Sequence, residues 1–339
     1  MPSITHDQAK SWLKNISNKD RVAILYDADS DGFSSAIIYY DWCKSQKANV
    51  KPIAYKRGSS KIKEMNLKDF NKIIITDIGP NAIVEELPLI KDKNVLYVDH
   101  HIAIPGIPQE INEYRVPKGT YHPSSRLAYE FTGLKGWLGL SGTLADAGQL
   151  YKENDDFIRE LIKPYNQTIE EYREKVTDKI NDTIIYFGRE ENFDEAFKIL
   201  SQLNGLEDIE KIMKYSKPVN DEFNYYTKDF HKNKEDLGGI IYYYFEPKFE
   251  IKGALATTLT IKENIGPVIF ATPGDKNFIS LSARDNQKKV NVLEILKAGM
   301  KDLKDANGGG HIFAAGAKIR SIDLQKFKEN VKSYLNSKK

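Results

Sequence analysis

Acidic residues and histidines follow three short apolar runs of this sequence, at the point where each run ends. They are Asp27, Asp29 and Asp31 after RVAILY, Asp77 after KIIIT, and Asp99, His100 and His101 after NVLYV. Asp146, in the small-residue stretch LADAG, is a further candidate. Ionised carboxylates and neutral imidazoles suit manganese or magnesium, with zinc and iron as alternatives. These residue types therefore indicate a metal site.

The elements that must position these residues are predicted to be parallel strands. The runs 21–26, 51–55, 72–76 and 94–98 are rich in strand formers and alternate with helix-like segments such as 80–90. Continuous apolar strands that alternate with helices predict a parallel sheet covered on both faces. Because the carboxyl ends of adjacent parallel strands meet in one crevice, we expect the three acidic clusters to converge there.

Helix capping is the main alternative explanation for these aspartates. An aspartate after a strand is often the N-cap of the next helix, which explains Asp31 alone as well as metal binding does and Asp77 alone better. The pair His100–His101 alone could be ordinary surface histidines. Without a cation, however, so many carboxylates in one crevice would repel each other and raise each other's pKa. We therefore favour the metal site for the three clusters together.

The sequence is predicted to fold as an α/β protein with three regions. Residues 1–185 form the parallel-sheet domain, with further helices at 124–131 and 140–151, the second of which carries Asp146. Residues 186–235 are charged and amphipathic, which is typical of a helical connector. Residues 236–339 form a smaller mixed α/β domain, with strand-like runs at 238–246, 267–272 and 277–283.

Composition indicates a cytoplasmic protein that does not bind a membrane. The chain has 339 residues, of which 40% are hydrophobic, so it can bury a core in more than one domain. Its net charge of +2 does not by itself indicate a nucleic-acid or membrane partner. The single cysteine, Cys43, fits a reducing compartment. The N-terminus does not resemble a signal peptide, and no apolar run approaches the roughly 20 residues that span a bilayer.

Five short motifs resemble those of a known family. DADSDG, TDIG, DHH and LADAG, in this order, resemble the four motifs of the DHH phosphoesterase superfamily. GGGHIFAAG, at residues 308–316, resembles the glycine-rich signature of its C-terminal DHH-associated domain. The form Asp-x-Asp-Gly at 29–32, followed by Ser34 and Ser35, is similar to the RecJ-like nucleases, and the short chain resembles their compact archaeal type. The resemblance implies a DHH domain joined by a helical connector to a DHH-associated domain.

The resemblance also implies a role for each residue of the metal site, which would hold two divalent ions, manganese in the first place and magnesium as the alternative. Asp29 and Asp31 match ligands of one metal each, Asp77 matches the carboxylate that bridges both, and His100 and Asp146 match further ligands. The catalytic set comprises these five residues and His101.

Three further residues near the metal site have open roles. His101 matches either a ligand or a phosphate contact, and Asp99 matches a residue that orients the neighbouring imidazole. Some relatives carry a histidine where this sequence has Leu25, so whether Asp27 touches a metal is left open.

The candidate substrate-binding residues come mainly from the C-terminal domain, which is expected to hold the substrate over the metals. They are Arg284, Gly308, Gly309, Gly310, His311 and Ser125. Glycines let backbone N–H groups approach an anion closely, and the planar guanidinium of arginine suits a phosphate. The alternatives are a flexible turn at 308–310 and an ordinary salt bridge between Arg284 and Asp285 or another acid.

Together these features predict a two-metal phosphodiesterase, in the first place an exonuclease that releases mononucleotides from single-stranded DNA or RNA. Two divalent ions would activate water and offset charge on the phosphoryl group. One alternative is a hydrolase of very short oligonucleotides (a nanoRNase) or of a nucleotide bisphosphate. An alternative of another class is a non-catalytic scaffold of the replication machinery. The expected partners are single-stranded nucleic acid or a short oligonucleotide, with replication or repair proteins as further candidates.

Overall fold

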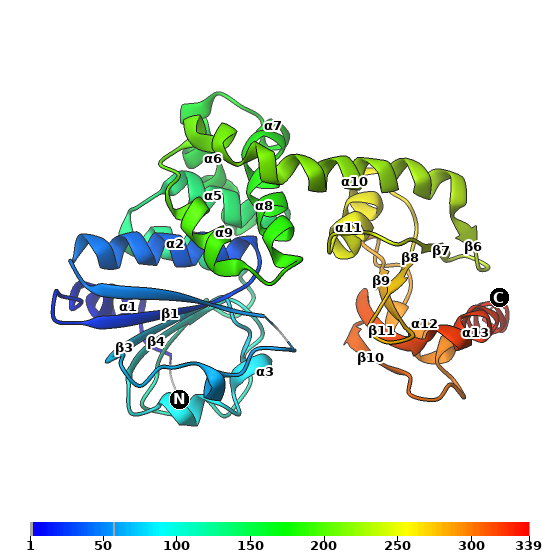
Figure 1. Cartoon of the computed structure of the whole chain (residues 1–339), viewed down its shortest axis with the longest axis horizontal. Helices are drawn as coiled ribbons and strands as arrows, with labels where there is room; N and C mark the ends of the chain where they lie inside the picture. The colour runs from blue at the N-terminus through cyan, green and yellow to red at the C-terminus, as the bar shows by residue number, and fades with distance from the viewer. Residues whose placement is uncertain (1–2, 57, 339) are drawn as a thin grey trace. The chain divides into compact units, whose positions relative to one another are not determined.

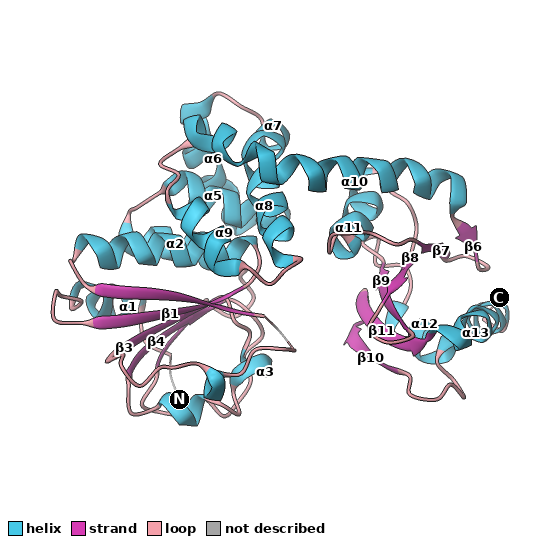
Figure 2. Ribbon diagram, in the orientation of Figure 1, coloured by secondary structure: helices cyan, strands magenta, loops and turns pink. Residues whose placement is uncertain are grey.

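The four predicted strands lie side by side in one parallel sheet. A fifth strand, which the sequence did not predict, pairs at one edge, so that the order is β2-β1-β3-β4-β5. Figure 2 shows this sheet, with β1, β3 and β4 labelled. All four pairings are parallel. The strands are β1 (Arg21–Asp27), β2 (Asn49–Tyr55), β3 (Lys72–Thr76), β4 (Asn94–Asp99) and β5 (Asn112–Arg115). This confirms the predicted α/β class.

Two apolar cores cover the two faces of this sheet. Successive residues of a strand point to opposite faces, which explains why the central strands are apolar throughout. Ile24, Ile74 and Leu96 belong to the core under α2 and the helices beside it, whereas Leu25 and Ile75 belong to the core on the other face, where α3 lies (Figure 1). The sheet is therefore a rigid central layer whose strand ends are fixed from both sides.

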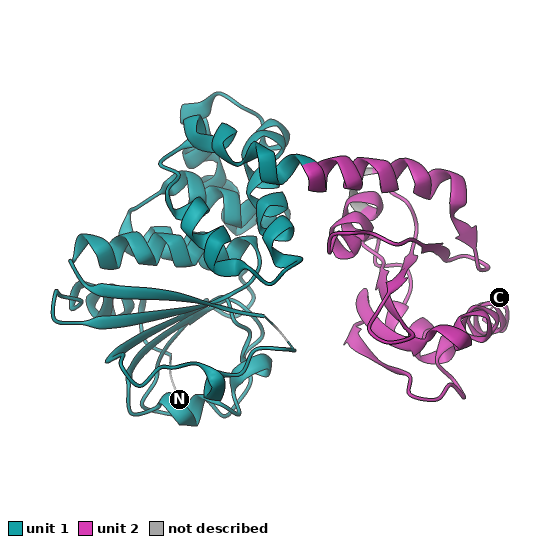
Figure 3. Cartoon of the chain, viewed as in Figure 1, with its two compact units in different colours: residues 1–217 teal, residues 218–339 magenta. Residues whose placement is uncertain are grey.

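The computed structural model describes residues 3–56 and 58–338, which divide into two compact units, 1–217 and 218–339 (Figure 3). The helices of the first unit are α1 (His6–Lys14), α2 (Ser30–Ser45), α3 (Pro80–Ile83), α4 (Ser124–Thr132), α5 (Gly136–Ala145), α6 (Asp155–Ile162), α7 (Ile169–Tyr172), α8 (Asp178–Gly188) and α9 (Phe193–Ser201). The predicted connector, 186–235, is mostly helical. It is shared between the units, because α10 (Met213–Asn233) begins in the first unit and ends in the second.

The second unit contains a six-stranded mixed sheet in the order β10-β11-β9-β8-β7-β6. Its elements are β6 (Glu235–Asp236), β7 (Ile241–Tyr244), α11 (Lys252–Lys262), β8 (Val268–Pro273), β9 (Phe278–Arg284), α12 (Val292–Gly299), β10 (Asn307–His311), β11 (Ala314–Arg320) and α13 (Leu324–Asn336). Leu296 of α12 and Phe327 of α13 are buried with Leu281 and Ile319 of the sheet. This confirms the predicted smaller mixed domain.

Within the described residues, no helix combines the length and the apolar character that crossing a bilayer requires.

Candidate metal centre

The ends of β1, β3 and β4 meet at one edge of the first sheet, as the sequence predicts. Two sets of side chains offer ligand atoms that all lie within 4.8 Å of one another. One set is Asp31, His100 and Asp146, and the other is Asp77, His100 and His101. Since His100 belongs to both sets, the two sets adjoin at its imidazole.

His100 lies at the centre of this cluster. Its Nε2 lies 3.1 Å from Oδ1 of Asp77, 3.4 Å from Oδ2 of Asp146 and 3.9 Å from Oδ2 of Asp31. Its Nδ1 is buried and has no hydrogen-bond partner among the described residues. The ring therefore directs one nitrogen at three carboxylates that come from three different elements.

Asp31 is held by the first amides of α4. Its two carboxylate oxygens accept hydrogen bonds from the backbone N–H groups of Ser124 at 2.6 Å and of Ser125 at 3.0 Å. The hydroxyl of Ser124 donates to Oδ1 of Asp77 at 3.1 Å. A helix N-terminus favours a carboxylate because its amides are otherwise unpaired. The beginning of α4 thus fixes two carboxylates of the cluster.

Ser125 itself is fully buried, and its hydroxyl donates to the carbonyl of Gly139 at 3.2 Å. A β-carbon at Gly142, one turn further along α5, would lie 2.5 Å from the same hydroxyl oxygen. The small residues of α4 and α5 therefore bring the two helices close together beside Asp31. Substrate binding by Ser125 stays a prediction; the contacts described here give it the role of holding Asp31.

Helix capping explains Asp29, rather than Asp31 or Asp77 for which it was the alternative. Asp29 is the N-cap of α2, and its Oδ1 accepts from the amide of Gly32 at 3.0 Å. Asp77 is not a cap, because the N-cap of α3 is Gly79. Asp77 instead lies in the left-handed region, with a φ of 63°, and turns its carboxylate to His100.

Gly32 is required by the tight turn between β1 and α2. A β-carbon at this position would lie 2.2 Å from the carbonyl oxygen of Asp27. The glycine of DADSDG therefore allows the chain to fold back on the end of β1. The Oδ1 of Asp27 accepts from the amide of Ala28 at 2.9 Å, and neither Asp27 nor Asp29 belongs to the two ligand sets found among the described residues.

Asp99 orients His101, and Arg115 in turn holds Asp99. Oδ1 of Asp99 lies 2.7 Å from Nδ1 of His101, and Nη1 of Arg115 donates both to Oδ2 of Asp99 and to the carbonyl of His101, at 2.9 Å each. Gly79 lies beside the ring of His101, where a β-carbon would come within 3.2 Å of it. Arg115 belongs to β5 and was missed in the sequence, because nothing near it in the chain marks it as part of the site.

Asp146 does not lie within a helix, which corrects the predicted helix at 140–151. α5 ends at Ala145, Asp146 is its C-cap, and Ala147 has a φ of 57°, so the chain turns away there. Oδ2 of Asp146 accepts a hydrogen bond of 2.5 Å from the hydroxyl of Tyr121, whose ring meets His100 edge-on at 4.9 Å. Tyr121 was also missed in the sequence.

The electrostatics of the cluster fit a divalent cation. Burial raises the pKa of Asp77 well above its ordinary value, and repulsion by the other aspartates adds to the rise. Burial lowers the pKa of His100, so its imidazole is neutral at pH 7 and can act as a ligand. Among the described residues no lysine or arginine lies within 4.0 Å of the carboxylates of Asp31 or Asp77. A bound cation would relieve this repulsion.

In the second unit, Arg284 ends β9 and is partly buried. Its Nη1 donates to the carbonyl of Ala283 at 3.0 Å, and no acidic side chain of the described residues pairs with it within 4.0 Å. Asp285 instead accepts hydrogen bonds from the amides of Lys289 and Val290, at 2.7 Å each. Burial and the neighbouring Arg284 lower the pKa of Lys252 to about 8. Lys252 and Arg284 thus lie close together, and among the described residues no carboxylate forms an ion pair with Arg284.

The glycines at 308–310 form a strand, which corrects the alternative of a flexible turn. β10 pairs with β11 at the edge of the sheet, and all its residues, including His311, are exposed. A β-carbon at Gly308 would come within 2.9 Å of Ala317, whereas one at Gly309 would meet nothing within 4 Å. Strand pairing therefore explains Gly308, whereas the described residues leave open space where a side chain of residue 309 would project.

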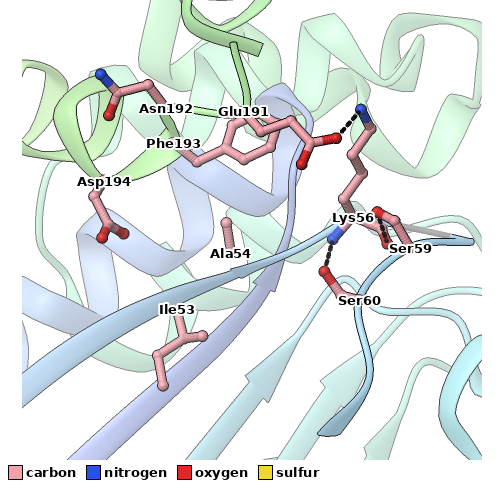
Figure 4. Close-up of a pocket in the computed structure, with 9 residues that line it drawn as sticks. All are labelled: Ile53, Ala54, Lys56, Ser59, Ser60, Glu191, Asn192, Phe193 and Asp194. Carbon is pink, nitrogen blue, oxygen red and sulfur yellow. Dashed lines mark hydrogen bonds and ion pairs between the residues drawn. The ribbon is translucent and has the colours of Figure 1, made fainter. Parts of the chain in front are cut away.

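A separate pocket of about 270 Å³ lies at the carboxyl end of β2, the strand beside β1 (Figure 4). Lys56 and Glu191 form an ion pair of 3.0 Å on its wall, and Ile53 and Phe193 supply apolar surface. The pocket was not predicted from the sequence, because its walls come from segments more than a hundred residues apart.

Two domain families match the chain. The model described as "DHH family, N-terminal domain" matches residues 21–147, and the model described as "DHHA1 domain" matches residues 238–337. The first match includes every candidate metal ligand, and the second includes Arg284 and the strand β10. No curated protein sequence matches the chain.

Several solved structures share this fold. RecJ from Thermus thermophilus, in complex with Mn²⁺, has a TM-score of 0.73 and 17% identity over 99% of this chain. The chain spans only 55% of that protein. An exonuclease RecJ bound to manganese has the same score and identity, with 99% of this chain and 95% of that chain covered. CDC45 from Entamoeba histolytica has a TM-score of 0.60 and 9% identity, with 98% of both chains covered. At these identities the likeness shows the fold alone.

Proposed function

We propose, from the premise that this chain belongs to the DHH family and carries a DHHA1 domain, that it is a metal-dependent phosphodiesterase acting on single-stranded nucleic acid. The observation that carries the proposal is the convergence of Asp31, Asp77 and Asp146 on the Nε2 of one neutral histidine. The finer proposal is an exonuclease that releases mononucleotides.

Asp31, Asp77, His100 and Asp146 would hold the metal ions, with Asp29 as a further ligand. Two divalent ions, manganese in the first place, would lower the pKa of a bound water molecule and would place positive charge near the phosphoryl oxygens. The protein's own contribution is to fix the ligands in advance. The amides of α4 hold Asp31, Ser124 holds Asp77 and Tyr121 holds Asp146.

His101 would contact the substrate phosphate. Its Nδ1 faces Asp99, which Arg115 holds from the other side. A carboxylate that accepts from one ring nitrogen fixes the tautomer and the orientation of the ring. The chain of Arg115, Asp99 and His101 therefore presents a fixed imidazole beside the cluster of carboxylates.

The DHHA1 domain would bind the nucleic-acid backbone through Arg284, the glycines of β10 and His311. Burial lowers the pKa of Arg284, and its charge has no carboxylate partner within 4.0 Å among the described residues. A phosphate would pair with this guanidinium by charge-assisted hydrogen bonds. The open space at Gly309 would let a phosphate oxygen approach the backbone of the edge strand.

The test is hydrolysis of end-labelled single strands, DNA and RNA separately, with and without manganese. We expect mononucleotides to appear from one end only, at all strand lengths, and no products in the presence of a chelator. Activity confined to di- to tetranucleotides, or to a nucleotide bisphosphate, would establish the short-substrate hydrolase instead. Tight binding of partner proteins without turnover on any substrate would establish the scaffold.

A further inference from the structure

Tyr121 and Tyr151 form a stacked aromatic pair that begins at the metal cluster. Their rings lie 4.0 Å apart with an angle of 12° between the planes. Tyr121 donates its hydroxyl to Asp146, and its ring lies at 89° to the ring of His100 with the centroids 4.9 Å apart. The pair therefore leads from two candidate ligands to Tyr151, which has 40% of its surface exposed.

Hydrogen bonds of Arg126, Glu153 and Asn154 connect the backbone of Tyr121 to the segment that follows Tyr151. The amide of Tyr121 donates to Oε1 of Glu153 at 2.6 Å, and its carbonyl accepts from Nδ2 of Asn154 at 3.0 Å. Arg126 donates from Nη1 to the carbonyl of Glu153 and to Oδ1 of Asn154, at 2.7 Å each. Asn154 is fully buried. The segment that carries Tyr151 is thus tied to the segment that carries Tyr121.

The exposed part of the Tyr151 ring does not pack into the hydrophobic core. Tyr151 and Leu150 are both large apolar side chains, with exposed fractions of 40% and 63%. A tyrosine ring whose position is fixed by a second ring loses little conformational freedom when a flat ligand stacks on it. Nucleobases are such ligands, and each base stacked on an aromatic ring contributes about 1–3 kcal/mol.

We propose that Tyr151, backed by Tyr121, is a stacking site for one nucleobase of the strand that the metal cluster cleaves. The inference rests on the proposed function, because it names a contact of that substrate. The base next to the cleaved phosphodiester lies on Tyr151 and sets the position of the strand at the cluster. Stacking tolerates any base, so this contact adds affinity without selecting a sequence.

The test combines variants of Tyr151 with strands that lack one base. Tyr151→Leu removes the ring and Tyr151→Phe keeps it, while Tyr225→Leu, at a 62% exposed tyrosine of the second unit, is the matched control. Abasic residues replace nucleotides one at a time from each end of the strand. On the full strand, Tyr151→Leu should lower kcat/KM about 10-fold, which is the effect of about 1.4 kcal/mol of stacking. Tyr151→Phe should stay near the parent protein.

The effect must disappear at one abasic position, where the parent protein and Tyr151→Leu should cleave equally well. The fluorescence of 2-aminopurine at that position gives a second readout, which should be quenched by the parent protein and Tyr151→Phe and not by Tyr151→Leu. Manganese affinity should be the same for all three.

Three results would overturn the proposal. An unchanged kcat/KM in Tyr151→Leu shows that no base stacks there, and an equal loss on every abasic strand shows that Tyr151 only supports the local structure. In both cases the parent protein still cleaves the strand, so the proposed function stands. A parent protein that neither binds nor cleaves single strands removes the proposed function and the stacking site together.

Discussion

Nε2 of His100 lies 3.1 Å from Oδ1 of Asp77, although 23 residues separate the two in the chain. They meet because β3 and β4 are neighbouring parallel strands that end at the same edge of the sheet. Asp77 departs from the strand with a positive φ, which turns its carboxylate toward the imidazole. The contact belongs to one of the two sets of candidate ligands and is made by the imidazole that both sets share, so Asp77 is the most informative position for testing the site.

Asp77→Asn should abolish manganese-dependent hydrolysis and leave the fold intact. Asparagine tolerates a positive φ, so the variant tests the charge rather than the backbone. We expect a loss of about 100-fold or more, because residues that merely orient metal ligands already cost about 10–100-fold. Since burial raises the pKa of Asp77 above its ordinary value, this carboxyl lowers the stability of the metal-free protein as the pH rises above that ordinary value.

The free energy of unfolding of Asp77→Asn, measured in urea with a chelator present, should therefore exceed that of the parent protein. Stabilisation by added manganese should be much weaker in the variant. Full activity in the variant would remove Asp77 from the site.

Tyr121→Phe should weaken manganese binding about 10–100-fold, because the hydroxyl that orients Asp146 is lost while the ring and its stacking remain. Titration followed by the electron paramagnetic resonance of free manganese measures this directly. Tyr225→Phe, which removes an exposed hydroxyl of the second unit, should bind manganese as the parent protein does. Equal affinities in all three proteins would show that Asp146 does not need Tyr121.

Gly32→Ala should destabilise the first unit by about 2 kcal/mol or more, because the added methyl group would overlap the backbone of Asp27 rather than a movable side chain. Unfolding in urea measures the change. Gly253→Ala is the control: nothing lies within 4 Å of a β-carbon there, and α11 should gain up to about 1 kcal/mol. A Gly32→Ala protein as stable as its parent would show that the DADSDG turn has room for a β-carbon at position 32.

Asp182 should make stability depend on pH independently of the metal site. It lies on α8, where its carboxylate accepts from Ser216 at 3.1 Å and burial raises its pKa to about 7. The unfolded carboxyl titrates near its ordinary value of 3.8, so between these two values the folded protein binds more protons. Stability must then fall as the pH rises through this window, by about 4 kcal/mol at most.

Asp182→Asn should remove this part of the slope and be more stable than the parent protein at pH 8. Urea unfolding at a series of pH values, with a chelator present, measures both effects. Glu190→Gln, an exposed change just beyond the end of α8, should leave the slope as it is. A slope that persists unchanged in Asp182→Asn would place the cause elsewhere.

Much of the first unit could be predicted because its signals are local. An apolar run such as KIIIT is buried on both faces of the sheet, and the acid behind it must lie at the carboxyl edge. The prediction failed where distant segments decide the structure. The alternative of a flexible turn at Gly308 to Gly310 is wrong, because pairing with β11 makes these residues an edge strand. Asp146 was expected within a helix that in fact ends before it.

The sequence by itself determined which chemical groups stand at which strand ends, because strand burial and residue type are written in consecutive residues. Only the tertiary structure decided which of these groups lie within contact distance of one another. Adjacency of β1, β3 and β4, together with the close packing of α4 and α5, brings Asp31, Asp77 and Asp146 to His100. Arg115 and Tyr121 join the site through contacts between segments far apart in the chain, and no local pattern records such contacts.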